Sequence, residues 1–186
     1  MSISPAKAGR RNLYPWRILG WGGAIALILT PLVAMQFTQE VNWNEADFVV
    51  ATAIFGIVGG LIELAVRVSC NWYFRFGAMF AVLAGFMAVW TNLAVGMIGN
   101  EDNPINLWFG IVLFIAIAGS LASRLHGSIL PFAMFLAGTV QIAIGTFAGI
   151  LGTDIRSGKF TIILSLMWFI ASLLFWRARQ IRHAKA

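Results

Sequence analysis

Residues 129–151 read ILPFAMFLAGTVQIAIGTFAGIL, without one charged side chain. An α-helix rises about 1.5 Å per residue and the hydrocarbon core of a bilayer is about 30 Å thick, so roughly 20 such residues cross it. This stretch is therefore long enough and apolar enough to span a membrane as a helix.

Five further stretches have the same character, at about 18–36, 48–66, 77–98, 107–121 and 160–176. The chain has 186 residues, of which 60% are hydrophobic and 11% charged. An ordinary soluble domain is about 45–50% apolar and about 25% charged. We predict an all-α, polytopic membrane helix bundle with six transmembrane helices. No segment is long and polar enough to fold a soluble catalytic or nucleic-acid-binding domain.

The basic residues predict the orientation of these helices. With six spans, all but two of the thirteen Lys and Arg residues fall on one side, at Lys7, Arg10, Arg11, Arg17, Arg67, Arg75, Arg124, Arg177, Arg179, Arg182 and Lys185. The other side holds Arg156, Lys159 and most of the acidic residues. Cytoplasmic loops carry the basic excess, so both termini are expected in the cytoplasm.

The predicted organisation has three parts, a basic cytoplasmic tail (1–17), a six-helix transmembrane domain (18–176) and a second basic cytoplasmic tail (177–186). The first span is expected to be retained, because its apolar run is longer than the core of a typical signal peptide. Basic groups at membrane ends attract anionic lipid headgroups. The bilayer is therefore the expected partner of these residues, and nucleic acid is not.

Residue types needed for familiar membrane chemistry are missing from the predicted spans. No span contains lysine, so a retinal Schiff base is excluded, and the only histidines, His126 and His183, lie outside the spans. Cys70 is the only cysteine, which excludes an internal disulfide or a thiolate metal site. We expect neither an enzyme nor a bound cofactor or metal.

Glu63 is the one carboxylate within a predicted span, and such residues are candidate functional sites. It lies near the inner boundary, and Arg67 follows four residues later, the favourable order for a helical ion pair. A structural pair at a helix end is the favoured interpretation. A proton or ion relay is the alternative.

Small residues recur every fourth position in three of the spans. Such ridges allow helix backbones to approach closely in lipid. They comprise Thr52, Gly56 and Gly60; Ala84, Ala88, Asn92 and Gly96; and Ala133, Ala137, Gln141, Gly145 and Gly149. They are expected to be packing seams within the chain, unless one is left for another subunit.

Two amides, Asn92 and Gln141, lie within these ridges. An unpaired amide in hydrocarbon costs several kcal/mol, so each is expected to have a partner. We hypothesise that 77–98 packs on 129–151 through the ridges, with the amides bonded to each other or to a neighbouring carbonyl. The indole of Trp168, deep in the last span, needs a partner as well.

The predicted outer turns carry helix-capping residues. Asn44 and Asp47 have the spacing of an approximate capping box, and Asn103 precedes Pro104, as at a helix start. The oxygen-rich turn 100–106 also has ligands that suit a hard cation such as calcium. Capping is the simpler explanation.

The run NLAVGMIGNEDNP at 92–104, together with Asn42-Trp43 and Asp47-Phe48, resembles a family of small, uncharacterised bacterial multi-pass inner-membrane proteins. The likeness covers roughly residues 40 to 125, and its E-D-N-P motif lies in the outer turn. The resemblance implies a bacterial cytoplasmic membrane. It supplies no catalytic residue, because no activity is assigned to that family.

We expect a non-enzymatic protein that works through packing, as an accessory or scaffold subunit of a larger membrane assembly or by self-association. The alternative is a small transporter or channel whose path passes Glu63, Asn92, Thr146 and Gln141. Permeases generally need charged or unwound sites near the midplane. Only one carboxylate lies in these spans, close to an end, which favours the first interpretation.

Overall fold

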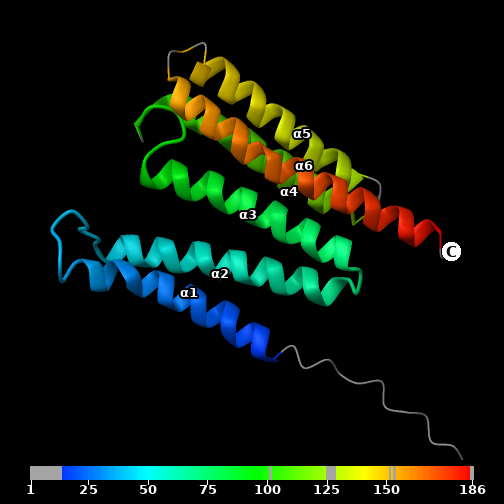
Figure 1. The fold of residues 1–186 in the computed structure, drawn as a ribbon, viewed down its shortest axis with the longest axis horizontal. Coiled ribbons are helices and arrows are strands. Elements are labelled where there is room, and N and C mark those ends of the chain that lie inside the picture. The colour runs from blue at the N-terminus through cyan, green and yellow to red at the C-terminus, as the bar shows by residue number, and fades with distance from the viewer. Residues whose placement is uncertain (1–13, 101, 125–128, 151, 153, 185–186) are drawn as a thin grey trace, which may run out of the picture. The chain divides into compact units, whose positions relative to one another are not determined.

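The computed structural model describes residues 14–100, 102–124, 129–150, 152 and 154–184, and every regular element in these ranges is a helix (Figure 1). The main helices are α1 (Tyr14–Ala34), α2 (Glu45–Val68), α3 (Trp72–Ala94), α4 (Phe109–Ala122), α5 (Ile129–Ile144) and α6 (Ile155–His183). A 3-10 turn, η1 (Pro104–Trp108), leads into α4, and a π-helical turn, η2 (Gly145–Ile150), continues α5.

Six helices are long and apolar enough to cross a membrane, when η1 is counted with α4 and η2 with α5. The prediction of an all-α, multi-pass membrane protein is thereby confirmed. Which side of the membrane holds the termini stays a prediction, and residues 1–13 and 185–186 of the two expected tails lie outside the described residues.

Several helix bounds differ from the predicted ones. The helix α6 begins before 160 and continues through Arg177 to His183, so most of the expected C-terminal tail is helical. In contrast, α3 ends at Ala94 and leaves Gly96 outside the helix. Hydropathy measures the apolar part of a helix, and polar residues such as arginine extend a helix without adding to that signal.

The chain separates into two compact units, Met1–Gly59 and Gly60–Ala186, and the boundary falls within α2. In the first unit, Trp21 of α1 lies over Gly59 of α2, where a Cβ atom would come within 2.8 Å of the indole. The predicted packing ridge of α2 does not make this contact. A Cβ at Gly56 would meet no described atom within 4 Å, and the same holds for Gly60. The ridge Thr52–Gly56–Gly60 is therefore not the surface that receives α1.

A capping box and an aromatic contact define the start of α2. The Asn44 side chain accepts hydrogen bonds from the N–H groups of Ala46 (2.8 Å) and Asp47 (3.2 Å), and the Asp47 carboxylate accepts from the N–H of Asn44 (2.8 Å). Trp43 packs edge-on against Phe48 with ring centroids 5.3 Å apart. These positions flank the cap as in a hydrophobic staple, which fixes the angle at which the chain enters the helix.

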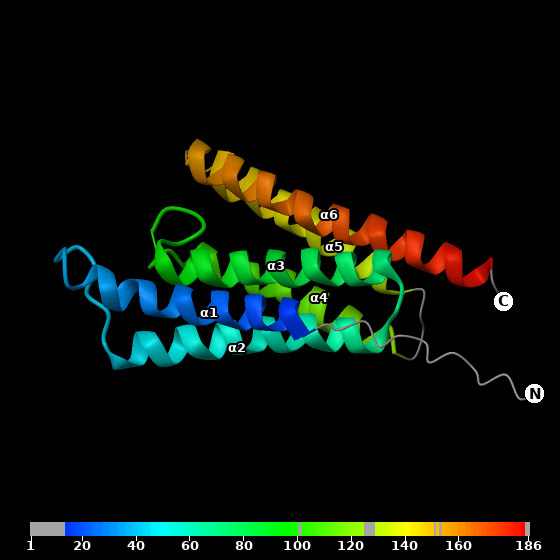
Figure 2. The same cartoon turned by 60° about the horizontal axis from the view of Figure 1, so that its bottom comes forward.

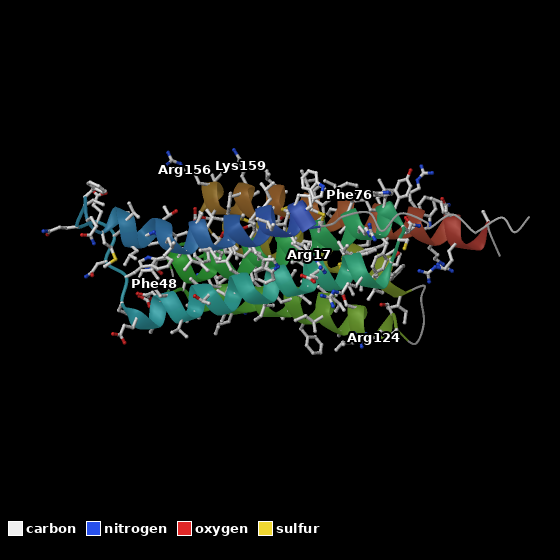
Figure 3. All side chains as sticks on the ribbon, turned by 90° about the horizontal axis from the view of Figure 1, so that it is seen from below. Arg17, Phe48, Phe76, Arg124, Arg156 and Lys159 are labelled. Carbon is white, nitrogen blue, oxygen red and sulfur yellow. The ribbon has the colours of Figure 1, made fainter. Side chains whose placement is uncertain are left out.

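In the second unit, α6 packs along both α3 and α5, and α4 packs along α5 (Figures 1 and 2). The helices α3 and α5 are therefore separated by α6. The centre of this bundle contains the buried side chains of Phe109, Met134, Ala137, Trp168 and Phe175. Basic residues lie at both of its ends, with Arg156 and Lys159 at the start of α6 and Arg124 beyond α4 (Figure 3).

Candidate functional site

A buried amide–indole pair joins α5 to α6 near the middle of both spans. Gln141 and Trp168 are each 1% exposed. The indole Nε1–H of Trp168 donates to Oε1 of Gln141 (2.8 Å), and Nε2 of Gln141 donates to the carbonyl oxygen of Thr161 (3.1 Å). The amide therefore uses its acceptor on one turn of α6 and a donor on another, which fixes the rotation and the register of the two helices.

Two further polar residues, Thr161 and Ser165, lie on the same face of α6 as Trp168 and are fully buried. The Ser165 hydroxyl donates to the carbonyl of Ile162 on its own helix. Neither residue was predicted from the sequence. The available signal was their spacing, because positions 161, 165 and 168 recur at the i, i+4, i+7 intervals of one helix face.

Glycines bring the backbones of η2 and α6 into contact. A Cβ at Gly149 would lie 2.2 Å from Cα of Gly158, and one at Gly158 would lie 2.8 Å from the carbonyl oxygen of Gly145. A Cβ at Gly145 would lie 2.9 Å from Cγ2 of Thr161. Of these residues, Gly145 and Gly149 belong to the predicted ridge, whereas Gly158 was not singled out. Close approach of this kind is typical of helix contacts in lipid.

The other end of the α5 ridge contacts a different helix. A Cβ at Gly119 of α4 would lie 2.0 Å from Cβ of Ala133, and Ala137 is fully buried. On α3, Ala84 and Ala88 are 4% and 1% exposed. The small residues of these two ridges that lie within helices are thus buried.

The hypothesis that the third and fifth helices pack on each other is wrong. The helix α6 separates them, because it returns along the bundle next to both. Asn92 does not reach Gln141, and its Nδ2 donates instead to the carbonyl of Ala88 on its own helix (2.7 Å). Gln141 does bond to a neighbouring carbonyl, but that carbonyl belongs to Thr161 of α6.

Two side-chain atoms in this region have no hydrogen-bond partner among the described residues. They are Oδ1 of Asn92 and Oγ1 of Thr161, and both atoms are buried. Because Nδ2 of Asn92 is held by a carbonyl, which can only accept, the unpartnered atom of that amide is its oxygen. Most buried polar atoms in folded proteins are paired, so these two need an explanation.

The loop between α3 and η1 is closed by Asn106, whose role the sequence analysis did not identify. Its Oδ1 accepts from the N–H groups of Met97 (3.0 Å) and Ile98 (2.8 Å), and its Nδ2 donates to the carbonyl of Asn100 (2.7 Å). Gly96 has φ +77°, and a Cβ there would lie 2.3 Å from that carbonyl oxygen. Gly96 is thus a loop residue, and its assignment to the α3 packing ridge was wrong.

Asp154 ties this loop to the start of α6. Its Oδ2 accepts from the N–H of Gly99 (2.9 Å), and its Oδ1 accepts from the N–H of Ser157 (3.2 Å). A side-chain hydrogen bond from Ser157, followed by the backbone bonds, holds the pKa of Asp154 below its ordinary value. These bonds favour the charged carboxylate, so the ionised form is the one that fastens the loop.

Asn103 caps η1 by accepting from the N–H of Ile105 (3.1 Å), with Pro104 in the first position. The first turn that follows is a 3-10 helix, and the α-helix begins only at Phe109. Within the described part of the chain, no three His, Cys, Asp or Glu side chains are grouped as metal ligands. Glu101 of the oxygen-rich turn lies outside that part.

Glu63 and Arg67 form an ion pair along α2, in which Nε and Nη2 of Arg67 both donate to Oε1 of Glu63. The Arg67 side chain is 67% exposed and that of Glu63 is 23% exposed. Pairs with this spacing stabilise a helix by about 0.2–0.5 kcal/mol. The arrangement is that of a local helix-stabilising pair close to the end of α2.

Arg75 closes the turn between α2 and α3, a role that the sequence analysis did not assign. Its guanidinium donates to the carbonyls of Val66 (2.9 Å) and Ser69 (2.7 Å) and lies over the Trp72 ring at 5.5 Å. The last carbonyls of a helix have no hydrogen-bond donor within the helix. Arg75 supplies such a donor to the carbonyl of Val66 at the end of α2. Nearby, Nδ2 of Asn71 donates to the carbonyl of Ala178 (3.3 Å), which fastens the turn to α6.

The candidate site comprises the buried residues Gln141, Thr161, Ser165 and Trp168 of α5 and α6, together with the half-buried Asn92 of α3. Their chemistry is hydrogen bonding between neutral groups, without a nucleophile activated by a base. Comparisons with protein-family models, with curated proteins and with solved structures found no match. The resemblance drawn from 92–104 therefore stays a prediction, and the function has to be argued from the site.

Proposed function

We propose that this protein is a non-enzymatic accessory or scaffold subunit of a larger assembly in the bacterial cytoplasmic membrane, with both termini in the cytoplasm. The observation that carries the proposal is the bonding of Gln141. This amide lies near the middle of its span, where a transporter would place a ligand group, yet α6 takes both its acceptor and a donor. The polar group is used to hold helices together.

The close backbone contacts support the same function. Gly149 lies against Gly158, and Gly119 lies against Ala133, with no room for a methyl group at either glycine. Helices that move past each other during transport need surfaces that can slide, whereas these contacts interlock at single positions. The pairing of Glu63 with Arg67 further removes the Glu63 carboxylate from a role as a lone ion ligand.

One exposed apolar surface of the second unit runs along η1 and α4. Its large apolar residues recur every three or four positions and are 53–79% exposed, namely Leu107, Ile111, Phe114, Ile117 and Leu121. A continuous apolar stripe of this kind suits the lipid tails and equally the apolar helix of another subunit. The scaffold proposal requires at least one such surface to be occupied by protein.

A small transporter or channel is the second candidate. The observation in its favour is that Oδ1 of Asn92 and Oγ1 of Thr161 are unpartnered within the spans. Thr146 is half-buried in η2 and belongs to the same proposed path. Against this candidate, both the oxygen and the nitrogen of the Gln141 amide are hydrogen-bonded to α6.

Photo-crosslinking in the native membrane tests the proposal. Phe114, Phe132 and Phe147 lie on α4, α5 and η2 and are 71%, 75% and 69% exposed, so each can be replaced by benzoylphenylalanine with little change in packing. A scaffold subunit is expected to give a reproducible protein adduct at the positions that face its partner and no protein adduct at the positions that face lipid. The positions without an adduct then serve as matched controls for those with one.

Two results would overturn the scaffold proposal. One is lipid adducts alone at all three positions, together with a protein that runs by itself in lipid nanodiscs. The other is solute or ion flux in proteoliposomes of the purified chain, above the flux of empty vesicles, which supports the transporter instead.

A further inference from the structure

The two unpartnered atoms belong to helices that pack against each other, and the register of that packing can be followed from other contacts. A Cβ at Gly77 of α3 would lie 3.1 Å from the Phe175 ring of α6. One at Gly85 would lie 3.6 Å from Leu113 of α4 and 3.9 Å from the Trp168 ring of α6. Eight residues forward on α3 thus correspond to seven residues backward on α6. The two helices are antiparallel and stay in step.

The same register brings Asn92 level with Thr161. Asn92 lies seven residues after Gly85, and Thr161 lies seven residues before Trp168. Seven residues are nearly two full turns, so each residue lies on the same face of its helix as the contact from which it is counted. Asn92 and Thr161 therefore lie at the same level along these two helices.

The two groups are chemically complementary. The amide oxygen accepts hydrogen bonds, whereas the hydroxyl both donates and accepts. Each is buried and neither bonds to the other. The methyl group Cγ2 of Thr161 faces Gly145 of α5, which leaves the hydroxyl to another side of the side chain.

We propose that Asn92 and Thr161 bind one internal water molecule between α3 and α6. The water donates one hydrogen bond to Oδ1 of Asn92 and forms a second hydrogen bond with Oγ1 of Thr161. Both unpartnered atoms then have a hydrogen-bond partner. Buried waters with two to four polar partners are regular parts of protein interiors. A water also joins groups that are too far apart for a direct bond.

This site extends the α5–α6 network to a third helix. The Thr161 backbone carbonyl binds Gln141, which binds Trp168, while the hydroxyl of the same threonine reaches the water and Asn92. Three helices are then linked through one residue of α6. The site goes beyond the scaffold function and does not depend on it.

Solid-state NMR on proteoliposomes tests the proposal directly, by measuring transfer of magnetisation from water protons. We expect transfer to the side chains of Asn92 and Thr161 and none to Ser165. Ser165 is the matched control, because it is equally buried on the same face of α6 but bonds its hydroxyl to Ile162. Thr161→Val should abolish the signal at Asn92, and Thr161→Ser should retain it.

A double-mutant cycle provides an independent measurement. We expect Asn92→Leu and Thr161→Val to be coupled by about threefold in the unfolding equilibrium constant, the average for one hydrogen bond between membrane helices. Absence of water transfer at both residues in the unmodified protein would overturn the proposal. A direct dipolar contact between the two side chains without water, or a signal that depends on whether sodium or potassium is present, would overturn it as well.

Discussion

Gly149→Ala offers the sharpest test of the packing between η2 and α6. The added methyl carbon would lie 2.2 Å from Cα of Gly158 and 2.7 Å from its backbone nitrogen. Non-bonded carbons rest about 3.5–4.0 Å apart, so the two backbones would have to separate by more than about 1 Å. The atoms that are met belong to the backbone, which cannot rotate away as a side chain would.

The cost follows from the size of that displacement. Forcing an extra carbon into a packed interior costs about 1–3 kcal/mol. Alanine also favours a helix over glycine by up to about 1 kcal/mol, which partly offsets the loss. Gly110→Ala is the matched control, because a Cβ at Gly110 would meet no described atom within 4 Å. The preference of alanine for a helix acts in both variants. The difference between their unfolding free energies, about 1–3 kcal/mol, therefore measures the backbone contact at Gly149.

Unfolding of the purified protein in mixed micelles by dodecyl sulfate, followed by circular dichroism, gives the required free energies. Agreement with a second probe such as tryptophan fluorescence would establish that the transition is two-state. If Gly149→Ala unfolds at the same free energy as Gly110→Ala, the backbone contact does not hold these helices and the reasoning from close approach fails.

Four further outcomes are expected. In a cysteine-free background, Asn100→Cys should be labelled by a membrane-impermeant thiol reagent from the periplasmic side, and labelling only from the cytoplasmic side would contradict the orientation. Glu63→Gln should lower the unfolding free energy by about 0.2–0.5 kcal/mol, as expected for a helical pair, and a lost flux with unchanged stability would favour the transporter. Gly145→Leu should destabilise the protein more than Gln141→Leu. A leucine at 145 must displace backbone as well as side chains, whereas the loss of one interhelical hydrogen bond costs about 0.6 kcal/mol on average. The reverse order of stabilities in the same unfolding assay would contradict this prediction. Hydrogen bonds from Ser157 and Gly99 hold the pKa of Asp154 below its ordinary value, so these bonds stabilise the fold fully above about pH 5 and are lost as the pH falls through the lowered pKa. The stability difference between the unmodified protein and Asp154→Asn should therefore be constant from pH 7 to 5 and shrink below pH 4, and a difference that grows on acidification would refute the assignment.

Features that depend on residues close in the chain could be predicted from the sequence. The six spans follow from apolar runs, and the start of α2 follows from Asn44 and Asp47, whose bonds reach across only three residues. The end of α6 could not be found in this way. Its last turns contain arginines, which favour a helix but lower the hydropathy by which the span was recognised.

Features that depend on which helices are neighbours were harder to predict. The sequence singled out Gln141 and Trp168 as residues that need partners, but it did not pair them, because they lie 27 positions apart on different helices. The small-residue ridges in which both amides lie suggested Asn92 as a partner for Gln141. Such ridges cannot distinguish adjacent helices from separated ones, and α6 lies between these two.

The α5 ridge shows why one repeated pattern does not imply one partner. Each step of four residues turns about 40° beyond a full turn of the helix, so the direction of the ridge changes by about 120° between Ala133 and Gly145. Ala133 accordingly meets Gly119 of α4, whereas Gly145 meets Thr161 of α6. An unbroken series of small residues over this length therefore serves two neighbours in succession. The repeat predicts close packing at every position, and the rotation of the helix decides which neighbour each position contacts.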